Sequence, residues 1–358
     1  MSTEPVLVGG FRQDYDWGKR DGLAEWTAVP TGGPQAELWF GAHPSGPSPV
    51  VMGDGTMADR IAGVPLLAKI LAAGSPLSLQ VHPDAETAEA WARDPTASDL
   101  LADSAEKTEM LIAIEPFRIL AGWTPAERAR DILAAVGADA AVLAALDAAD
   151  RATAVRLLLG DRPVATDVDG WRRAVRAAGA GDVAEENMAF VADRFGTDRG
   201  VAVAALLASD LLAPGDAVYV PAGVPHAYVA GVGFEVMNSS DNVLRLGLTG
   251  KRMSVEHSLA AIRDDRSAVI IRAPADHCYA PAGAPFRVQT LAGQQTYDAP
   301  TGAYRLVVVL AGSGDVTTDS VTKVAQAGQA IAIPAQAAAA RVTTTGHAVV
   351  VAATEASQ

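Results

Sequence analysis

The spacing of hydrophobic and polar positions divides the chain into four stretches. Residues 1–122 contain short apolar runs separated by glycine and proline, such as "LLAKILAAG" and "EMLIAIEPFRILAGW", which are typical of strands and turns. In residues 123–212 apolar positions recur three and four apart, a period that predicts helices. Strand-like runs return at 213–257 and continue through 258–358. The pattern therefore predicts a mainly β protein with one α-helical insertion.

Two helix starts can be predicted within these stretches. The segment "PDAETAEAWARD" places helix-forming residues after Asp84, whose side chain suits a helix N-cap. Thr124 and Pro125 followed by Glu127 are typical of a cap and first turn. Breaks at "GDRPVATDVDG" and "GAGD" divide the insertion into several helices. No polar cluster in the insertion has the composition of a chemical site.

Two β segments resemble each other. "GDAVYVPAGVPHAYV" (215–229) and "GQAIAIPAQAAAARV" (328–342) share a glycine, a proline six residues later and an apolar run between them. Five residues past the proline the first copy has His226 and the second has Ala339. We interpret the pair as two related β-barrel units, of which the first keeps a polar inward residue. Chance similarity between alanine-rich strands is the alternative.

Composition and charge restrict the class of protein. The chain has 358 residues, 49% of them hydrophobic and 20% charged, which suits about two or three domains. It has no apolar run long enough to span a bilayer and no basic-then-apolar start, so we expect a cytoplasmic protein without a membrane partner. The net charge of −14 argues against a nucleic-acid partner. A single cysteine, Cys278, excludes an internal disulfide framework and a cysteine-rich zinc site.

The stretch "LSLQVHPD" (77–84) carries an unusual set of polar residues. If it is a strand, alternation puts Ser78, Gln80 and His82 on one face and leucine and valine on the other. Buried polar groups are costly unless they are satisfied. That face is therefore either wet or turned toward a ligand.

Two further residues are candidates to join it. His226, one of six histidines, and Glu109, which opens the run "EMLIAIEP", both lie in strand-like context. Taken singly, each histidine fits a structural role and the glutamate fits a solvated one. Together with His82 and Gln80 they form a mixed nitrogen and oxygen set that suits zinc, and also manganese or iron. Such a site can polarise a carbonyl or activate water.

Five stretches in register resemble the type I mannose-6-phosphate isomerases, zinc-dependent enzymes of the cupin fold. They are "DYDWGKRDG", "AELWFGAHPSGPS", "LLAKILAAGSPLSLQVHPD", "EKTEMLIAIEPF" and "GDAVYVPAGVPHAYV" with its continuation "EVMNSSDNVLRLGLTGKR". The resemblance implies a catalytic cupin (jelly-roll) barrel built from 1–122 and 213–257. The helical insertion would occupy 123–212, and a degenerate cupin barrel 258–358.

The resemblance also implies a reaction and a set of site residues. One zinc ion per chain would be held by Gln80, His82, Glu109 and His226. The enzyme would interconvert D-mannose 6-phosphate and D-fructose 6-phosphate through an enediol(ate). Arg245 would stabilise the enediolate charge, while the resemblance leaves the base open among Lys69, Lys107, Asp241 and Glu235.

Other pocket residues follow from the same motifs. Lys251 would bind the phosphate, and the remaining lining or supporting positions are Ser78, Trp17, Tyr228 and Glu37. For Tyr15 we expect packing only. Where many relatives read Lys-Pro-Glu, this chain has Thr108 between Lys107 and Glu109. Since proline fixes φ and lacks an N–H, we expect a looser loop with unchanged ligand spacing.

Three other functions remain open at this point. A two-histidine, one-carboxylate iron oxygenase would use the same ligands but would need neither Gln80 nor the lysines. A metal-containing protein that only binds sugar phosphates is the second, and an isomerase of another aldose or aldose phosphate is the third. The sequence leaves the oligomeric state undetermined, a monomer included, and also the metal used in the cell and the direction of the pathway.

Overall fold

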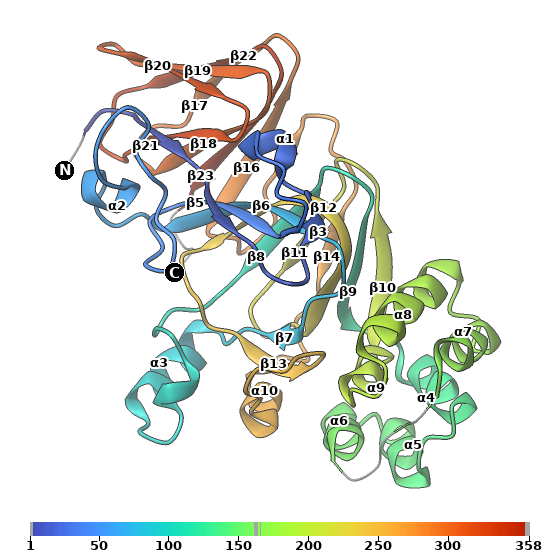
Figure 1. Ribbon diagram of the computed structural model, residues 1–358. Coiled ribbons are helices and arrows are strands. Elements are labelled where there is room, and N and C mark those ends of the chain that lie inside the picture. The colour runs from blue at the N-terminus through green and yellow to red at the C-terminus, as the bar shows by residue number, and fades with distance from the viewer. Residues whose placement is uncertain (1–2, 161–163, 165, 355–358) are drawn as a thin grey trace.

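The computed structural model describes residues 3–160, 164 and 166–354. Figure 1 shows strands from the C-terminal part above a central β body, with a group of helices against one side of that body. The structure is mainly β, as the hydrophobic pattern predicts. The predicted helix break at 160–170 lies partly outside the described residues.

The central body has two antiparallel walls that share one long strand, β12 (His226–Asn238). The first wall runs in the order β14 (Val269–Ile271), β11 (Ala217–Val220), β8 (Glu109–Ala113), β12, β6 (Leu66–Ala73), β5 (Glu37–Phe40) and β2 (Phe11–Gln13). The second wall contains β10 (Leu207–Leu212), β9 (Phe117–Trp123), β7 (Leu79–Val81) and β13 (Leu244–Gly247). The first half of β12 pairs with β7 and β9, and the second half pairs with β6 and β8.

A bulge in β12 changes which of its residues face inward. The pairing register shifts between Tyr228 and Ala230, and Gly231 follows with φ of +142°. An extra residue reverses the alternation of side chains along a strand. As a result His226 and Tyr228 before the bulge and Glu235 after it all point to the inside of the barrel.

The helical insertion covers the outer face of the second wall (Figure 1). Its helices are α4 (Ala126–Ala135), α5 (Ala140–Asp147), α6 (Arg151–Leu159), α7 (Val168–Ala177), α8 (Asp182–Phe195) and α9 (Gly200–Ala204). Leu79 and Val81, the apolar face predicted for "LSLQVHPD", are fully buried in the same cluster as Trp171 of α7. The predicted start of α4 differs, since Pro125 is its N-cap and no side chain caps it.

Two glycines let the insertion and the barrel meet at backbone distance. A Cβ on Gly200 of α9 would lie 2.6 Å from the Leu248 nitrogen and 2.7 Å from Gly247 Cα. We therefore expect Gly200→Ala to lower the free energy of unfolding by about 1–3 kcal/mol, the usual cost of overpacking. Urea denaturation checks this. Gly250→Ala is the matched control, because a Cβ there meets nothing within 4 Å, and equal stabilities of the two variants would contradict the expectation.

The C-terminal part consists of two sheets. The first has the order β1 (Val6–Gly9), β21 (Gln329–Ile333), β18 (Arg305–Ala311), β23 (His347–Ala353), β16 (Phe286–Ala292) and β15 (Cys278–Tyr279). The second has the order β17 (Gln295–Ala299), β22 (Ala340–Thr344), β19 (Ser313–Thr317) and β20 (Thr322–Gln326). The run Leu306–Val309 is buried on both sides, alternately against the first wall and the four-stranded sheet. Such burial on both faces explains the uninterrupted apolar stretch.

The strand β1 pairs with β21, so residues 6–9 lie with the C-terminal sheet. The division at 122, 212 and 257, and the description of the last part as a degenerate barrel, stay predictions.

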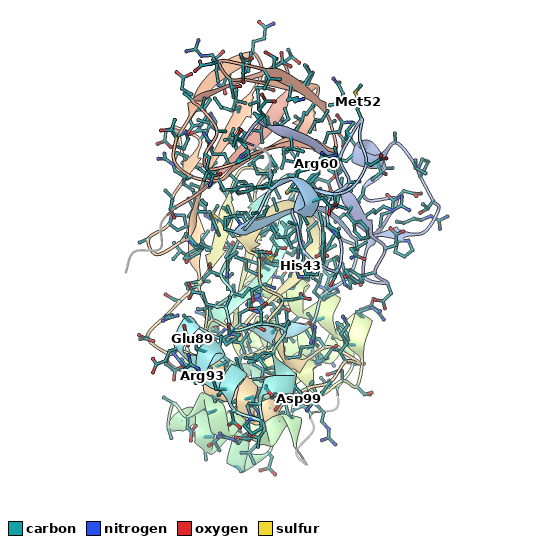
Figure 2. All side chains as sticks on the ribbon, turned by 90° about the vertical axis from the view of Figure 1, so that its left-hand side faces the viewer. His43, Met52, Arg60, Glu89, Arg93 and Asp99 are labelled. Carbon is teal, nitrogen blue, oxygen red and sulfur yellow. The ribbon has the colours of Figure 1, made fainter. Side chains whose placement is uncertain are left out.

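Short elements complete the fold. They are α1 (Ala24–Thr27), α2 (Met57–Arg60), α3 (Ala85–Arg93), the 3₁₀ turn η1 (Ser98–Leu100), α10 (Val255–Ala261) and the strand pair β3 (Lys19–Arg20) and β4 (Pro34–Gln35). Asp84 caps α3 as predicted, accepting from the Thr87 N–H at 3.0 Å. Figure 2 places His43 near the middle of the molecule, between Met52 at the C-terminal strands and Asp99 at the opposite end.

Candidate functional site

Strand register brings the predicted ligands together at the inner side of the second wall. His226 lies directly opposite Gln80, and Arg245 lies opposite Gln80 from the other neighbouring strand. Glu109 begins β8 and pairs with Met237, near the far end of β12. Three strands and the turn after β7, which carries His82, thus converge on one point.

His82, Glu109 and His226 form a compact buried group whose ligand atoms all lie within 4.8 Å of one another. The His226 Nε2 atom is 2.9 Å from Glu109 Oε1, and the His82 Nε2 atom is 3.2 Å from Glu109 Oε2. The Gln80 amide is 3.2 Å from the His226 Nε2 atom. In a tetrahedral site with metal–ligand bonds of about 2.0 Å, neighbouring ligand atoms lie about 3.3 Å apart. The separations observed here are close to that value.

The ring protons of both histidines point away from this group. His82 Nδ1 lies 2.7 Å from the Asn242 carbonyl, and His226 Nδ1 lies 2.9 Å from the Val224 carbonyl. Since a carbonyl only accepts, each Nδ1 carries a proton, and Nε2 is the atom of each ring that can offer a lone pair to a metal. Burial and the nearby Lys107 lower the pKa of His82 to about 3, so its ring is neutral.

Lone pairs and a carboxylate therefore face each other across short distances, an arrangement that favours a cation between them. Burial raises the pKa of Glu109, but Lys107, whose Nζ lies 3.5 Å from Glu109 Oε2, opposes this and favours the ionised carboxylate. Glu109 Oε1 has no hydrogen-bond partner although it is buried. The donor set fits a metal ion, with an amide rotation presenting the Gln80 oxygen to the same point.

A second buried cluster lies beside the first. Lys69 Nζ is 3.5 Å from Glu37 Oε1 and 3.2 Å from Glu235 Oε2. Trp39 fixes Glu37 by donating its indole N–H to Oε2 at 2.8 Å. Burial alone lowers the pKa of Lys69, but Glu37 and Glu235 outweigh it and raise the pKa above its ordinary value. Burial raises the pKa of Glu235 to about 7 in spite of Lys69.

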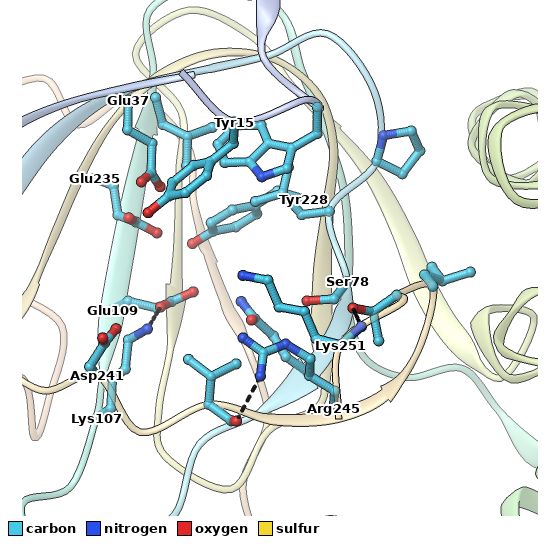
Figure 3. A pocket seen from close by; sticks show the side chains of 18 of the residues that line it. Tyr15, Glu37, Ser78, Lys107, Glu109, Tyr228, Glu235, Asp241, Arg245 and Lys251 are labelled. Carbon is cyan, nitrogen blue, oxygen red and sulfur yellow. Dashed lines mark hydrogen bonds and ion pairs between the residues drawn. The ribbon is translucent and has the colours of Figure 1, made fainter. Parts of the chain in front are cut away.

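Both clusters open into one cavity of about 670 Å³. Buried polar atoms without a hydrogen-bond partner gather at its wall: Glu109 Oε1, Tyr228 Oη, Glu235 Oε2 and Arg245 Nε. Figure 3 shows the Tyr228 hydroxyl pointing into the space between Glu235 and Glu109, with Arg245, Ser78 and Lys251 across from them. Because buried polar groups are normally satisfied, this wall is suited to a polar ligand.

The structure places all the predicted site residues in or behind this cavity. Twelve line it: Trp17, Glu37, Lys69, Ser78, Gln80, Lys107, Glu109, Tyr228, Glu235, Asp241, Arg245 and Lys251. His82 and His226 lie just behind the wall and are 1% and 0% exposed. The expectation for Tyr15 was wrong, because its ring also lines the cavity and stacks on Trp17 at 5.6 Å.

Two asparagines that hold the loop before Glu109 were not among the predicted residues. Asn242 is fully buried, its side chain binds the backbone of residues 102, 103 and 105, and its carbonyl orients His82. Asn238 accepts from the Thr108 N–H at 2.8 Å. That donor would be missing if position 108 were proline, so the loop before Glu109 is tethered here rather than loosened. The only sequence signal was their place in "NSSDN", next to Asp241.

Comparisons with known proteins agree with this geometry. Residues 8–126 match the model of the catalytic domain of phosphomannose isomerase type I. The chain is 30% identical over 311 residues to the mannose-6-phosphate isomerase of Ogataea parapolymorpha, covering 72% of each chain. It is 29% identical over 284 residues to that of Salmonella typhimurium, covering 70% of this chain and 73% of the relative.

The fold is likewise shared with solved structures. A crystal structure of mannose 6-phosphate isomerase bound with zinc and yttrium superposes with a TM-score of 0.78 at 24% identity, covering 98% of this chain and all of that one. The predicted mainly β, cupin fold is thereby confirmed.

Proposed function

The chain belongs to the family of type I mannose-6-phosphate isomerases, and we propose that it interconverts D-mannose 6-phosphate and D-fructose 6-phosphate with zinc as its metal. The observation that carries the proposal is the convergence of two histidine Nε2 atoms, Glu109 and Gln80 at the base of a polar, cation-bearing cavity. An iron oxygenase would have no use for Gln80 or for the lysines.

Zinc would be held by Gln80, His82, Glu109 and His226. Zinc bound there supplies Lewis-acid stabilisation of the negative charge that develops on the sugar oxygens. Because the other members of the set are neutral, Glu109 contributes its one formal negative charge.

Glu235 suits the role of the base that moves the proton between C2 and C1. Its carboxylate is buried in the cavity wall, with Oε2 3.2 Å from Lys69 Nζ, and its pKa, raised by burial to about 7, lies near neutral pH, which favours both uptake and return of a proton. Lys69 has a raised pKa and stays charged, so it acts as a hydrogen-bond donor rather than as the base. The other two candidates fit the role of the base less well. Lys107 Nζ forms an ion pair with Glu109 Oε2 at 3.5 Å, and the side chain of Asp241 is 55% exposed.

Arg245 suits the enediolate oxygens. It lies opposite Gln80 in the pairing of β13 with β7, its Nε has no partner, and its Nη1 reaches only the Val243 carbonyl at 3.4 Å. Ser78 and Tyr228 line the space between Arg245 and Glu235 (Figure 3) and would orient the sugar hydroxyls.

Lys251 would bind the phosphate group. Its amine lies 5.8 Å from the centre of the Tyr15 ring at the mouth of the cavity. We expect Lys251→Ala to raise the KM for mannose 6-phosphate about tenfold with little change in kcat, since one exposed charge-assisted contact is worth about 1.5 kcal/mol. Steady-state kinetics checks this, with Lys323→Ala in the C-terminal part as control. An unchanged KM would remove Lys251 from phosphate binding.

The cellular setting is part of the proposal. Among the helices of residues 3–160, 164 and 166–354, none combines the length and apolarity needed to cross a membrane. We propose a cytoplasmic enzyme acting on a small sugar phosphate.

A coupled assay that follows fructose 6-phosphate tests the function. Mannose 6-phosphate should be converted, and mannose without phosphate should react far more slowly. Equal or faster conversion of another aldose phosphate would reassign the substrate, and no conversion of any aldose would leave a protein that only binds sugar phosphates.

A further inference from the structure

The mouth of the cavity is built from three segments that are far apart in the sequence. Tyr15, Asp16 and Trp17 come from the loop after β2, Lys251 from the loop after β13, and Arg194 from the last turn of α8. Arg194 Nη2 lies 3.0 Å from Asp16 Oδ2, so this ion pair joins the helical insertion to the N-terminal loop across the rim. The insertion therefore contributes a cation to the cavity.

Helix α8 holds Arg194 at this rim through contacts with the barrel. Asn187, fully buried two turns earlier, donates to the Ile119 carbonyl at 3.0 Å and to the Asp210 carbonyl at 3.3 Å. Arg118 of β9 donates in turn to the Asn187 side-chain oxygen at 3.2 Å. Since Ile119 and Asp210 pair in β9 and β10, the second wall fixes the position of α8 and of its last turn.

The cations that line the cavity differ in the number and burial of their ion-pair partners. Lys69 is enclosed by two glutamates, and Lys107 lies against Glu109, all of them buried. Arg194 pairs with Asp16 and lies 5.6 Å from the centre of the Phe195 ring, and the side chains of the ion pair are 45% and 82% exposed. An exposed pair of this kind contributes little to stability. Arg194 is therefore available to another anion at the rim.

A phosphate is a stronger partner for this guanidinium than Asp16. It carries close to two negative charges near neutral pH, and arginine binds it through two parallel N–H donors. Within a six-carbon sugar the phosphate lies at the end opposite C1 and C2. With C1 and C2 near the metal ligands at the base, it lies toward the rim, where Lys251 stands over Tyr15, the neighbour of Asp16. The net charge of −14 makes a second cation useful there.

From this we infer that Arg194 of the helical insertion is a second phosphate-binding residue, which exchanges Asp16 for the 6-phosphate of the substrate. The inference rests on the proposed function for the identity of the sugar phosphate. It gives the insertion a direct role in substrate recognition.

The test measures binding without turnover. Mannitol 6-phosphate has no carbonyl to isomerise, and its dissociation constant for the zinc-loaded protein can be measured by titration calorimetry. We expect Arg194→Ala to weaken binding about tenfold and Arg194→Lys to recover part of it. Asp16→Asn should bind at least as tightly as the unchanged chain. Mannitol, which lacks the phosphate, should show no difference between the variants.

Arg173→Ala is the matched control, because it removes the same charge from an exposed position of α7 outside the cavity. Equal dissociation constants for Arg194→Ala and Arg173→Ala would overturn the inference, as would failure of the unchanged chain to bind mannitol 6-phosphate. Binding that depends on Arg194 without conversion of mannose 6-phosphate would overturn the proposed function alone.

Discussion

Replacing Glu109 with glutamine is expected to abolish metal binding and to reduce isomerase turnover by about a thousandfold or more, with the fold intact. The carboxylate is the one formal negative charge in the ligand group, and its oxygens lie 2.9 and 3.2 Å from the two Nε2 atoms. A glutamine amide would donate from its nitrogen to one of these Nε2 atoms and would lack the negative charge that attracts a cation. Loss of Lewis-acid stabilisation accounts for a change in turnover of that size.

Metal content after dialysis and kcat on the same samples measure this effect. Glu127→Gln, an exposed change of the same kind on α4, should retain both. A Glu109→Gln protein that kept one tightly bound metal per chain would contradict the assignment of Glu109 as a ligand.

Arg245→Ala is expected to lower kcat by about a hundredfold to a thousandfold while metal content stays unchanged. The guanidinium faces Gln80 from β13 but does not belong to the histidine and glutamate group. Loss of one preorganised donor at a developing oxyanion has an effect of this order. Arg245→Lys should recover part of kcat because it restores the charge without the planar fork.

The combination of low kcat and full metal content separates this role from metal binding. Arg341→Ala, an exposed arginine of β22 that pairs with Asp298, serves as the control. Near-normal turnover of Arg245→Ala would remove Arg245 from the mechanism.

Local patterns were sufficient to identify the ligand candidates. Alternation along a strand predicts that Ser78 and Gln80 share a face, and both line the cavity, while Leu79 and Val81 pack under the helices. Glu109 opens β8, as the apolar run that follows it indicates. Alternation along single strands does not show which distant residues share a site. The family resemblance placed Lys251 and Arg245 in the same site as these residues.

Long-range features of the site could not be predicted in the same way. The bulge near Ala230 reverses the alternation of β12 and so brings Glu235 to the side of His226. One extra residue in a strand, as in a β-bulge, cannot be recognised from the hydrophobic pattern of the sequence. The contact of Asp16 with Arg194 joins positions 178 residues apart, and only the docking of α8 on the barrel creates it.

Polar residues that act through the backbone were also missed. Asn242 and Asn238 hold the loop that leads to Glu109, yet asparagine outside a regular element is usually interpreted as a turn residue. Their role follows from the backbone groups that they bind, which the complete fold brings to them.

A metal-dependent isomerase is tested most directly by one coupled assay with mannose 6-phosphate on purified protein. Turnover and metal content should be measured as isolated, after treatment with a chelator, and after zinc is returned. We expect activity to disappear with the metal and to return with about one zinc per chain. Undiminished isomerisation by the metal-free protein would contradict this expectation.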